Sequence, residues 1–467
     1  MPTITIDGTE YEVPEGRMVL QAIDDLGLLM NGVDIPHYCW HPKLSIDGSC
    51  RLCQVEIEGM PKLQIACNTP VANGMKIHTR NERVLAARRG VMELLPINHP
   101  LDCPICDQAG ECKLQDYAFQ WGVPESRTRE PRRPAKKAVD LGPTIVFDQE
   151  RCILCRRCVR FCREVPKTGE LGVFNRGDES LLEVFPGSEL DNPYSMNVAD
   201  ICPVGALTTR DFRFKIRVWF LDDVKSVCNQ CSRGCNLVAS RSNNKVYRFV
   251  PRRNDAVNET WMCDHGRMSY KLNGQGRVEA PRVDGREVTF TDAVKRAAEL
   301  LRATLDARGK IVGIASPFAS NADLAAFRDL LARLGAGNAR FSVPRGEADD
   351  VLIEAEKAPN AAGCRALGMT ESNDSIGRAD LALVLGHTLT AEVFGDVGNI
   401  VLVDSHESAL SARAAVVLPA RTFLEKTGAF TNSRGLVQKF SAVVEPEFEA
   451  WSEADTLAQV AAAAGVS

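Results

Sequence analysis

Seventeen cysteines are the residues of this sequence best suited to chemistry, and all but Cys364 lie between Cys39 and Cys263. Four of them fall within the eleven residues CILCRRCVRFC, at positions 152–162, with gaps of two, two and three. The opening Met-Pro-Thr-Ile-Thr-Ile-Asp lacks the basic and apolar segments of a secretion signal, so we expect a reducing compartment. Clustered thiols in such a compartment bind metal more often than they form disulfides.

Segment 152–162 and a distant Cys-Pro pair predict one cubane cluster. C-x2-C-x2-C is the spacing with which a loop wraps three corners of a [4Fe-4S] cluster, and two-cluster ferredoxins add x3-C-P. A second such run would end at Cys202-Pro203, but the three positions where its other cysteines would stand hold Asn192, Ser195 and Val198. Cys162 is therefore the spare thiol, and the expected ligands are Cys152, Cys155, Cys158 and Cys202. Zinc is the less favoured alternative, since its ligands usually come as two separated pairs.

A second set, with gaps of ten, two and thirteen residues, predicts a [2Fe-2S] cluster held by Cys39, Cys50, Cys53 and Cys67. Four thiolates on the loops of a β-rich domain suit a binuclear cluster. Gly48 and Ser49 before Cys50 let backbone N–H groups approach the sulfurs. His37 and His41 are rival ligands, which we interpret as local structure because four thiolates already close the site.

A third set has only three cysteines and needs one more ligand. His99 stands four positions before the first of them, so a [4Fe-4S] cluster held by His99, Cys103, Cys106 and Cys112 is expected. A neutral imidazole in place of a thiolate makes a cluster less negative and tends to raise its potential. The alternative is a zinc site with the same four ligands.

A fourth set, with gaps of two, three and twenty-seven residues, predicts a third [4Fe-4S] cluster held by Cys228, Cys231, Cys235 and Cys263. Fifteen cysteines and one histidine thus make four sites, and Cys162 and Cys364 are left over without an assigned role. Four arginines stand beside ligands, where they either offset cluster charge or face solvent or a partner: Arg51, Arg156, Arg157 and Arg160.

The totals describe an ordinary globular protein. A length of 467 residues requires several domains. A net charge of -5 argues against binding of nucleic acid, and no apolar run reaches the roughly 18 to 20 residues that cross a bilayer, so no direct membrane insertion is expected. No phosphate loop or dinucleotide fingerprint follows a predicted strand. The chain is therefore expected to relay electrons between partners and to carry no substrate site or catalytic residue of its own.

Periodicity supplies the elements that position these residues. A hairpin turns at Asp7-Gly8, a helix covers 18–29, strands cover 55–57 and 62–66, and a helix runs from Asn81-Glu82 to Pro96. Near the C-terminus, strands at 311–315, 381–385 and 400–403 and a helix at 322–334 form a βαβ pattern with a parallel sheet. The expected domains are 1–78, 79–121, a basic linker at 122–140, 141–219, 220–276 and 277–467.

The set at Cys39, Cys50, Cys53 and Cys67 is followed by HPLDCPICDQAGECKLQD and then by CILCRRCVRFC with its distant CPVGALT. Motifs in this order resemble the large iron-sulfur subunit of respiratory complex I, the G subunit of NADH:quinone oxidoreductase. The resemblance covers residues 1 to about 280. It implies an α+β multidomain fold: a β-grasp [2Fe-2S] domain, a helical segment with one histidine and three cysteines as ligands, a bacterial-ferredoxin-like domain and a molybdopterin-oxidoreductase-type [4Fe-4S] domain. It also implies a bacterial hetero-oligomeric complex on the cytoplasmic side of the inner membrane, with this chain peripheral.

The same resemblance implies an electron path. Electrons from NADH and FMN in the F subunit enter at the Cys39 set, pass the Cys152 set and then the His99 set, and continue to the I subunit, with the E subunit as a further partner. The Cys228 set lies off this path.

The C-terminal part resembles the molybdopterin oxidoreductase fold at EKAPNAAGCRALG and GAFTNSRGLVQ, but only 204 residues follow Cys263. We expect a trimmed α/β remnant that holds no molybdopterin. An NAD-linked formate dehydrogenase or hydrogenase is the rival interpretation, and Cys364 lies 101 residues after Cys263, where a molybdenum ligand could fall. Detection of molybdenum or pterin would favour this rival.

Overall fold

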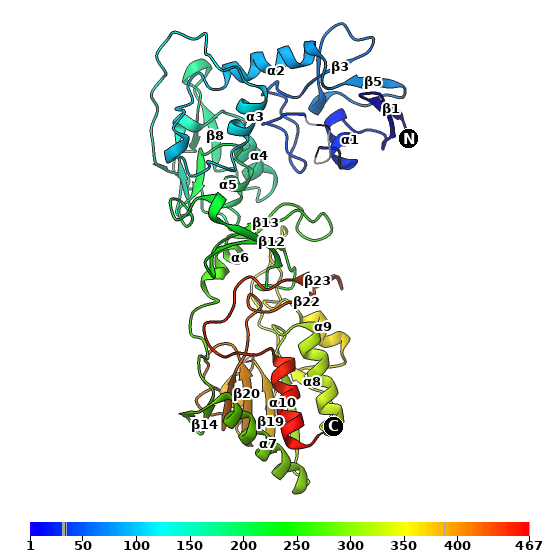
Figure 1. The fold of residues 1–467 in the computed structure, drawn as a ribbon, viewed down its shortest axis with the longest axis vertical. Coiled ribbons are helices and arrows are strands. Elements are labelled where there is room, and N and C mark those ends of the chain that lie inside the picture. Colours follow the sequence, from blue (N-terminus) through cyan, green and yellow to red (C-terminus); the bar gives the residue numbers. More distant parts are fainter. Residues whose placement is uncertain (30–32, 34, 387, 467) are drawn as a thin grey trace. The chain divides into compact units, whose positions relative to one another are not determined.

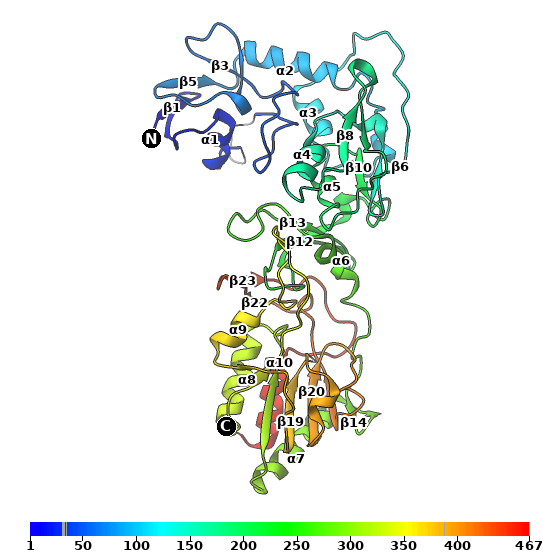
Figure 2. The same cartoon turned by 180° about the vertical axis from the view of Figure 1, so that it is seen from behind.

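The computed structural model describes residues 1–29, 33, 35–386 and 388–466, which form two compact units, Met1–Phe220 and Leu221–Ser467 (Figures 1 and 2). Each unit has its own sheets and its own buried apolar clusters. Among the described residues, no helix has both the length and the apolar character that spanning a bilayer requires.

The first unit begins with a five-stranded sheet in the order β2-β1-β5-β3-β4. Asp7 and Gly8 both have positive φ, as a primed turn requires, so the predicted hairpin is confirmed. The predicted helix at 18–29 is shorter than expected, because the chain leaves the helix at Leu26 and Gly27 takes a φ of +68°. The elements are β1 (Thr3–Ile6), β2 (Thr9–Glu12), α1 (Val19–Asp25), β3 (Gln54–Ile57), β4 (Gln64–Ile65), η1 (Ala66–Asn68) and β5 (Met75–His78).

The rest of this unit carries short elements joined by long loops. Helix α2 (Glu82–Leu94) begins where the sequence predicts a helix start, and the Asn81 side chain caps it by accepting a hydrogen bond from the Val84 N–H at 3.0 Å. The other elements are η2 (Cys103–Ile105), α3 (Lys113–Trp121), β6 (Val139–Asp140), β7 (Ile145–Phe147), η3 (Gln149–Arg151), α4 (Arg157–Glu164), β8 (Leu171–Phe174), η4 (Gly177–Glu179), β9 (Leu181–Val184), α5 (Asn197–Ile201), β10 (Leu207–Thr209) and η5 (Val218–Phe220).

The expected basic linker makes ion pairs with acidic groups of its own unit. Arg127 pairs with Glu93 at 2.5 Å, and Lys137 pairs with Glu150 at 2.6 Å and with Asp102 at 3.3 Å. Part of its positive charge is therefore neutralised within the unit.

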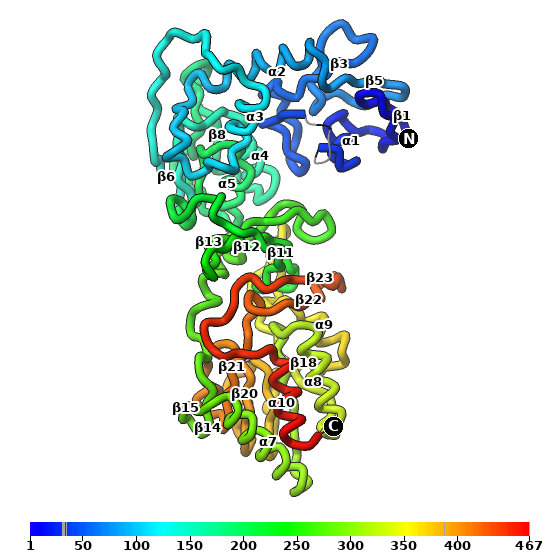
Figure 3. The backbone as a smooth tube through the Cα atoms, in the orientation of Figure 1, coloured from blue at the N-terminus to red at the C-terminus, as the bar shows by residue number. Residues whose placement is uncertain are grey.

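The second unit contains a three-stranded sheet, β11-β12-β13, and an eight-stranded sheet in the order β15-β14-β21-β20-β19-β16-β17-β18. Figure 3 traces the backbone of this unit, coloured from green to red. The six strands from β16 to β21 pair in parallel, which confirms the predicted βαβ pattern, and β14 and β15 add an antiparallel edge. The smaller sheet comprises β11 (Asp222–Val227), β12 (Asn236–Ser242) and β13 (Lys245–Pro251).

The large sheet and its helices comprise β14 (Arg282–Val283), β15 (Arg286–Glu287), α7 (Phe290–Asp306), β16 (Ile311–Ala315), α8 (Asn321–Arg333), β17 (Arg340–Phe341), α9 (Ala361–Ala366), β18 (Thr370–Glu371), β19 (Ala379–Leu385), β20 (Val397–Asp404), β21 (Val416–Pro419) and α10 (Glu453–Ala464). The remaining elements are α6 (Asp264–Met268), η6 (Ser269–Lys271), η7 (Ala391–Phe394) and the hairpin β22 (Gly428–Thr431) with β23 (Val437–Phe440).

A buried ion triad lies between α8 and α10 in the second unit. Lys426 Nζ lies 2.8 Å from Asp323 Oδ2 and also bonds Glu453 Oε2. Burial, with the nearby Asp323 carboxylate, raises the pKa of Glu453 to about 7 despite the opposing effect of Lys426.

Candidate metal centres

All seventeen cysteines are free thiols. We call the four sets the Cys39 site (Cys39, Cys50, Cys53, Cys67), the His99 site (His99, Cys103, Cys106, Cys112), the Cys152 site (Cys152, Cys155, Cys158, Cys202) and the Cys228 site (Cys228, Cys231, Cys235, Cys263). In the part of the chain that the structure describes, no three His, Cys, Asp or Glu side chains converge closely enough to hold one metal ion.

The Cys39 site gathers four thiols from the loops beside β3 and η1. Cys39 Sγ lies 3.4 Å from Cys50 Sγ, and the Cys67 thiol contacts those of Cys39 and Cys53. Contact with Cys50 and Cys67 lowers the pKa of the Cys39 thiol. Four converging thiols fit the donor set of an iron-sulfur cluster.

The two neighbouring histidines have local partners. His37 Nδ1 lies 2.8 Å from the Ile35 carbonyl oxygen, and burial lowers the pKa of His37 to about 3. His41 Nδ1 accepts a hydrogen bond from the Lys43 N–H at 3.3 Å. These contacts agree with a local structural role for both rings.

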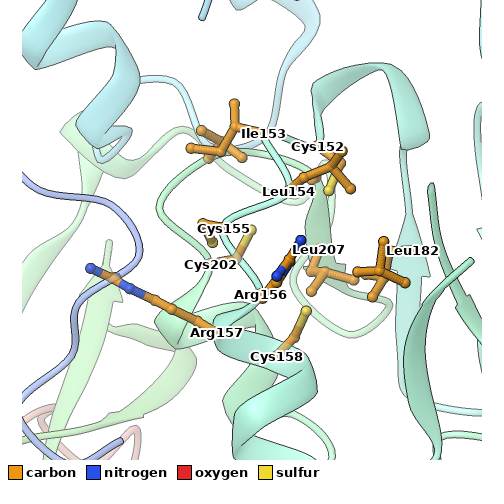
Figure 4. Close-up of a pocket in the computed structure, with 13 residues that line it drawn as sticks. Cys152, Ile153, Leu154, Cys155, Arg156, Arg157, Cys158, Leu182, Cys202 and Leu207 are labelled. Atoms are coloured by element: carbon orange, nitrogen blue, oxygen red, sulfur yellow. The ribbon is translucent and has the colours of Figure 1, made fainter. Parts of the chain in front are cut away.

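The Cys152 site is a small pocket lined by its four cysteines (Figure 4). Leu154 and Arg156 have φ values of 52° and 57°, which turn the loop so that three thiols from one segment share the pocket. Burial raises the pKa of the Cys202 thiol to about 12.

The His99 site lies on the loop around η2 and at the start of α3. Burial raises the thiol pKa of both Cys106 and Cys112. Burial also lowers the pKa of His99 to about 4, so its ring is neutral at pH 7. The His99 Nδ1 atom is buried and has no hydrogen-bond partner among the described residues. A neutral ring nitrogen without a hydrogen-bond partner suits a metal ligand. Within the described residues, no hydrogen bond joins the His99 ring to the three thiols of its site.

The loop after Cys202 packs against the His99 site. The Lys113 N–H donates to the Pro203 carbonyl oxygen at 3.1 Å, and Cys112 Sγ lies 3.9 Å from the same oxygen. A Cβ atom built on Gly205 would lie 2.3 Å from Cys106 Sγ, so only glycine allows this approach. The Cys152 and His99 sites are therefore direct neighbours.

An ion pair connects the same two sites. Arg151 Nη2 donates to Asp102 Oδ2 at 2.6 Å, and its Nε donates to Asp102 Oδ1 at 3.1 Å. Arg151 directly precedes Cys152, and Asp102 directly precedes Cys103. The ion pair therefore holds the starting points of both cysteine loops together.

On its other side the Cys152 site adjoins the Cys39 site. Arg157, at the start of α4, donates hydrogen bonds to the carbonyl oxygens of Trp40 and Ile201. Burial lowers the pKa of Arg157, and the nearby thiols of Cys155 and Cys39 oppose that shift. The Cys39 and Cys152 sites are thus neighbours, and the Tyr38 hydroxyl, which donates to the Lys113 carbonyl oxygen at 3.5 Å, brings the Cys39 loop beside the His99 site as well.

The Cys228 site belongs to the second unit. Cys228 follows β11, and its N–H donates to the Cys235 carbonyl oxygen at 2.8 Å. Cys263 caps α6, where its sulfur accepts from the Gly266 N–H at 3.3 Å, and burial raises its pKa to about 11. Cys231 adds a third thiol to the loop between Cys228 and Cys235, and all four thiols lie near one another.

The two leftover cysteines occupy other surroundings. Cys162 lies on α4, fully buried, and its thiol contacts Glu170. Cys364 lies on α9 within the apolar core of the second unit, where burial raises its pKa to about 12. Neither thiol belongs to one of the four sites.

Sequence profiles of five families match successive parts of the chain. They include binding domains for both [2Fe-2S] and [4Fe-4S] clusters. The matches are a 2Fe-2S iron-sulfur cluster binding domain (1–82), an NADH-ubiquinone oxidoreductase-G iron-sulfur binding region (88–127), an NADH-quinone oxidoreductase subunit 3 ferredoxin-like domain (142–208), a molybdopterin oxidoreductase Fe4S4 domain (222–273) and a molybdopterin oxidoreductase domain (351–463).

Curated relatives agree with these matches. The G subunit of NADH-quinone oxidoreductase from Rickettsia conorii is 40% identical over 342 residues, which cover 72% of this chain and 50% of the relative. The chain is a homologue of this G subunit. The mitochondrial NADH dehydrogenase [ubiquinone] iron-sulfur protein 1 from Solanum tuberosum is 38% identical over 340 residues, which cover 72% of this chain and 45% of that protein.

The chain spans about half the length of the curated relatives of the G subunit that it matches. Among solved structures, a chain of an NAD+-reducing [NiFe]-hydrogenase in the H2-reduced state matches with a TM-score of 0.41 and 29% identity, covering 46% of this chain and 91% of that chain.

Several residues that hold these sites together are not singled out by sequence reasoning. They are Gly205, Arg151 and Asp102, although each stands within three residues of a predicted ligand. The glycine three positions after Cys202 in CPVGALT is the clearest signal available, because close backbone approach commonly requires glycine.

Proposed function

We propose that the chain is an electron-relay subunit of an NADH-quinone oxidoreductase complex, passing electrons from the NADH/FMN subunit toward quinone. The observation that carries the proposal is the adjacency of three cysteine-rich sites, the Cys39, Cys152 and His99 sites, within the first unit. Neighbouring sites of this kind support the electron path that the family resemblance implies, from the Cys39 site through the Cys152 site to the His99 site.

In this proposal the Cys39 site holds one [2Fe-2S] cluster, and the His99, Cys152 and Cys228 sites hold one [4Fe-4S] cluster each. When bound, such clusters accept and release single electrons. The chain's own residues bury the ligands, exclude water and fix the ligand loops against one another. Burial of Cys106, Cys158 and Cys228 keeps the sites dry, which favours transfer between fixed centres over reaction with solvent.

The remaining parts have supporting roles. The Cys228 site lies off the main path, and the α/β domain of the second unit packs and scaffolds without molybdopterin. The proposed partners are the F, E and I subunits, in a complex on the cytoplasmic face of a bacterial inner membrane where this chain is peripheral. The proposed domains are 1–78, 79–121, 122–140, 141–219, 220–276 and 277–467.

The proposal is tested on anaerobically purified chain by iron and acid-labile sulfide assays and by electron paramagnetic resonance of the reduced protein. One binuclear and three tetranuclear centres are expected. Absence of iron and sulfide would contradict the proposal, and zinc in their place would establish structural metal sites. Bound molybdenum or pterin, or reduction of the clusters by formate, would favour the formate dehydrogenase alternative.

A further inference from the structure

Helix α4 begins within the Cys152 site and carries two buried arginines. Arg157 is 5% exposed and Arg160 is 4% exposed, whereas 69% of the Arg163 side chain on the same helix is exposed. A spacing of three residues brings the first two onto one face of the helix. Figure 4 shows Arg157 extending from the start of α4 toward the blue ribbon of the N-terminal segment.

The guanidinium group of Arg157 connects the ligand loops of two sites. Its Nη2 atom donates to the Trp40 carbonyl oxygen at 2.5 Å, and Trp40 directly follows the ligand Cys39. Its Nη1 atom donates to the Ile201 carbonyl oxygen at 3.2 Å, and Ile201 directly precedes the ligand Cys202. One side chain therefore fixes the backbone beside a ligand of each site.

Arg160 reinforces the same contact. Its two terminal nitrogens donate to the carbonyl oxygens of Cys39 and Ser45. The Ser45 N–H in turn donates to Glu164 Oε2, on the same helix, at 2.8 Å. Helix α4 thus holds the loop that contains Cys39 through the guanidinium donors of Arg157 and Arg160 and through the Glu164 carboxylate, which accepts.

Neither of these two arginines has a carboxylate partner among the described residues. Among the residues that the structure describes, no Asp or Glu oxygen lies within 4.0 Å of either guanidinium group, and the Nε of each is buried without a hydrogen-bond partner. A buried cation without an anion is costly. Thiols of both sites lie close enough to act electrostatically on Arg157, namely those of Cys155, Cys39, Cys202 and Cys50. Thiolate-bound clusters would supply the missing negative charge.

Building on the proposed function, we propose that Arg157 is a positioning residue shared by the Cys39 and Cys152 sites. It fixes the spacing of their loops, and its buried charge raises the reduction potentials of both bound clusters. Each one-electron reduction adds one negative charge to a site. A buried cation beside that site stabilises the reduced form more than the oxidised form.

The experiment is a redox titration of the full chain monitored by electron paramagnetic resonance, with iron and sulfide assays on each sample. The variants are Arg157→Gln, Arg157→Lys and, as the matched control, the exposed Arg163→Gln. Arg157→Gln is expected to lower the equilibrium constant for reduction at least tenfold at both centres, about 59 mV for one electron. Arg157→Lys keeps the charge and shifts both centres less, and Arg163→Gln leaves both as in the wild type.

The outcomes separate this inference from the proposed function. A wild-type chain without iron-sulfur signals overturns both. Normal clusters with potentials in Arg157→Gln equal to those of Arg163→Gln overturn the shared role, as does a shift confined to one centre. If Arg157→Gln loses its clusters, the Arg157→Lys variant decides the question. Near-normal potentials at both centres of Arg157→Lys support the role of the charge. Loss of its clusters, or a tenfold lower equilibrium constant for reduction, overturns that role.

Discussion

Gly205 offers the sharpest test of how the sites are built, because substitution by alanine adds one methyl group against a proposed ligand. The Cβ atom of Gly205→Ala would lie 2.3 Å from Cys106 Sγ and 3.0 Å from Gln108 Cβ. Ordinary contacts between such atoms need about 3.5 Å or more, so Cys106 must move by at least about 1 Å. Metal-ligand distances tolerate only about 0.2 Å of deviation. The displacement exceeds that tolerance several-fold.

We therefore expect Gly205→Ala to lose the cluster of the His99 site and to keep those of the Cys39 and Cys228 sites. Overpacking of this kind costs about 1–3 kcal/mol, which the first unit should survive as a folded domain. The assays are iron and sulfide content, electron paramagnetic resonance of the reduced chain, and thermal unfolding followed by circular dichroism.

The matched control is Gly90→Ala, within α2, where an added Cβ atom meets no atom within 4 Å. It should retain every cluster and gain up to about 1 kcal/mol, because alanine favours a helix interior over glycine. Full iron content and an unaltered His99-site signal in Gly205→Ala would refute the reasoning that this glycine is needed for the ligand geometry.

Three further predictions follow from the sites and the ion triad. Cys155→Ser should abolish NADH-to-quinone activity, whereas Cys231→Ser should leave it largely intact in an assembled complex; equal losses with normal assembly would contradict the order of the sites. His99→Cys should keep a cluster at a lower midpoint potential, since a thiolate adds negative charge; an unchanged midpoint in a redox titration would remove His99 from the ligands. The folded pKa of Glu453, about 7, lies above its ordinary value of 4.5, so its contribution to the free energy of unfolding is complete below pH 4.5 and is lost as the pH rises through 7. Glu453→Gln should remove this loss, which amounts to up to about 3 kcal/mol of the free energy of unfolding. The test is urea unfolding at pH 5 and pH 8, and a difference in unfolding free energy between the two pH values as large in Glu453→Gln as in the wild type would disprove the prediction.

The fold is largely predictable where periodicity and turn chemistry act locally. The Asp7-Gly8 hairpin, the Asn81 cap and the parallel strands of the second unit all follow from short-range patterns. Helix α3 is not predicted, because only Leu114 and Trp121 of its residues are buried, which leaves little apolar period to read. The predicted helix at 18–29 is too long because its apolar pattern continues past the residue where Gly27 turns the chain.

The candidate sites are predictable as far as the spacing of cysteines reaches. The Cys-Pro pair that remains of the second ferredoxin run identifies Cys202 as a candidate. In the structure its thiol lines one pocket with the thiols of the 152–158 segment. The links between sites are not predictable. Arg157 bonds carbonyl oxygens 117 and 44 residues away, at Trp40 and Ile201, and a backbone carbonyl has no signature in a sequence. The unpaired charge of Arg157 becomes visible only once its surroundings are known.

The contact between Gly205 and Cys106 has a consequence for how the protein is made. These residues are 99 positions apart, and a ribosome adds about 5–20 residues per second, so about 5–20 s separate their appearance. During that interval the newborn His99 loop has no Cys202-Pro203 wall to close it. Iron delivered then would meet an open, oxygen-sensitive set of thiols. In the proposed function, loading of a cluster at the His99 site would therefore wait until translation has passed residue 205.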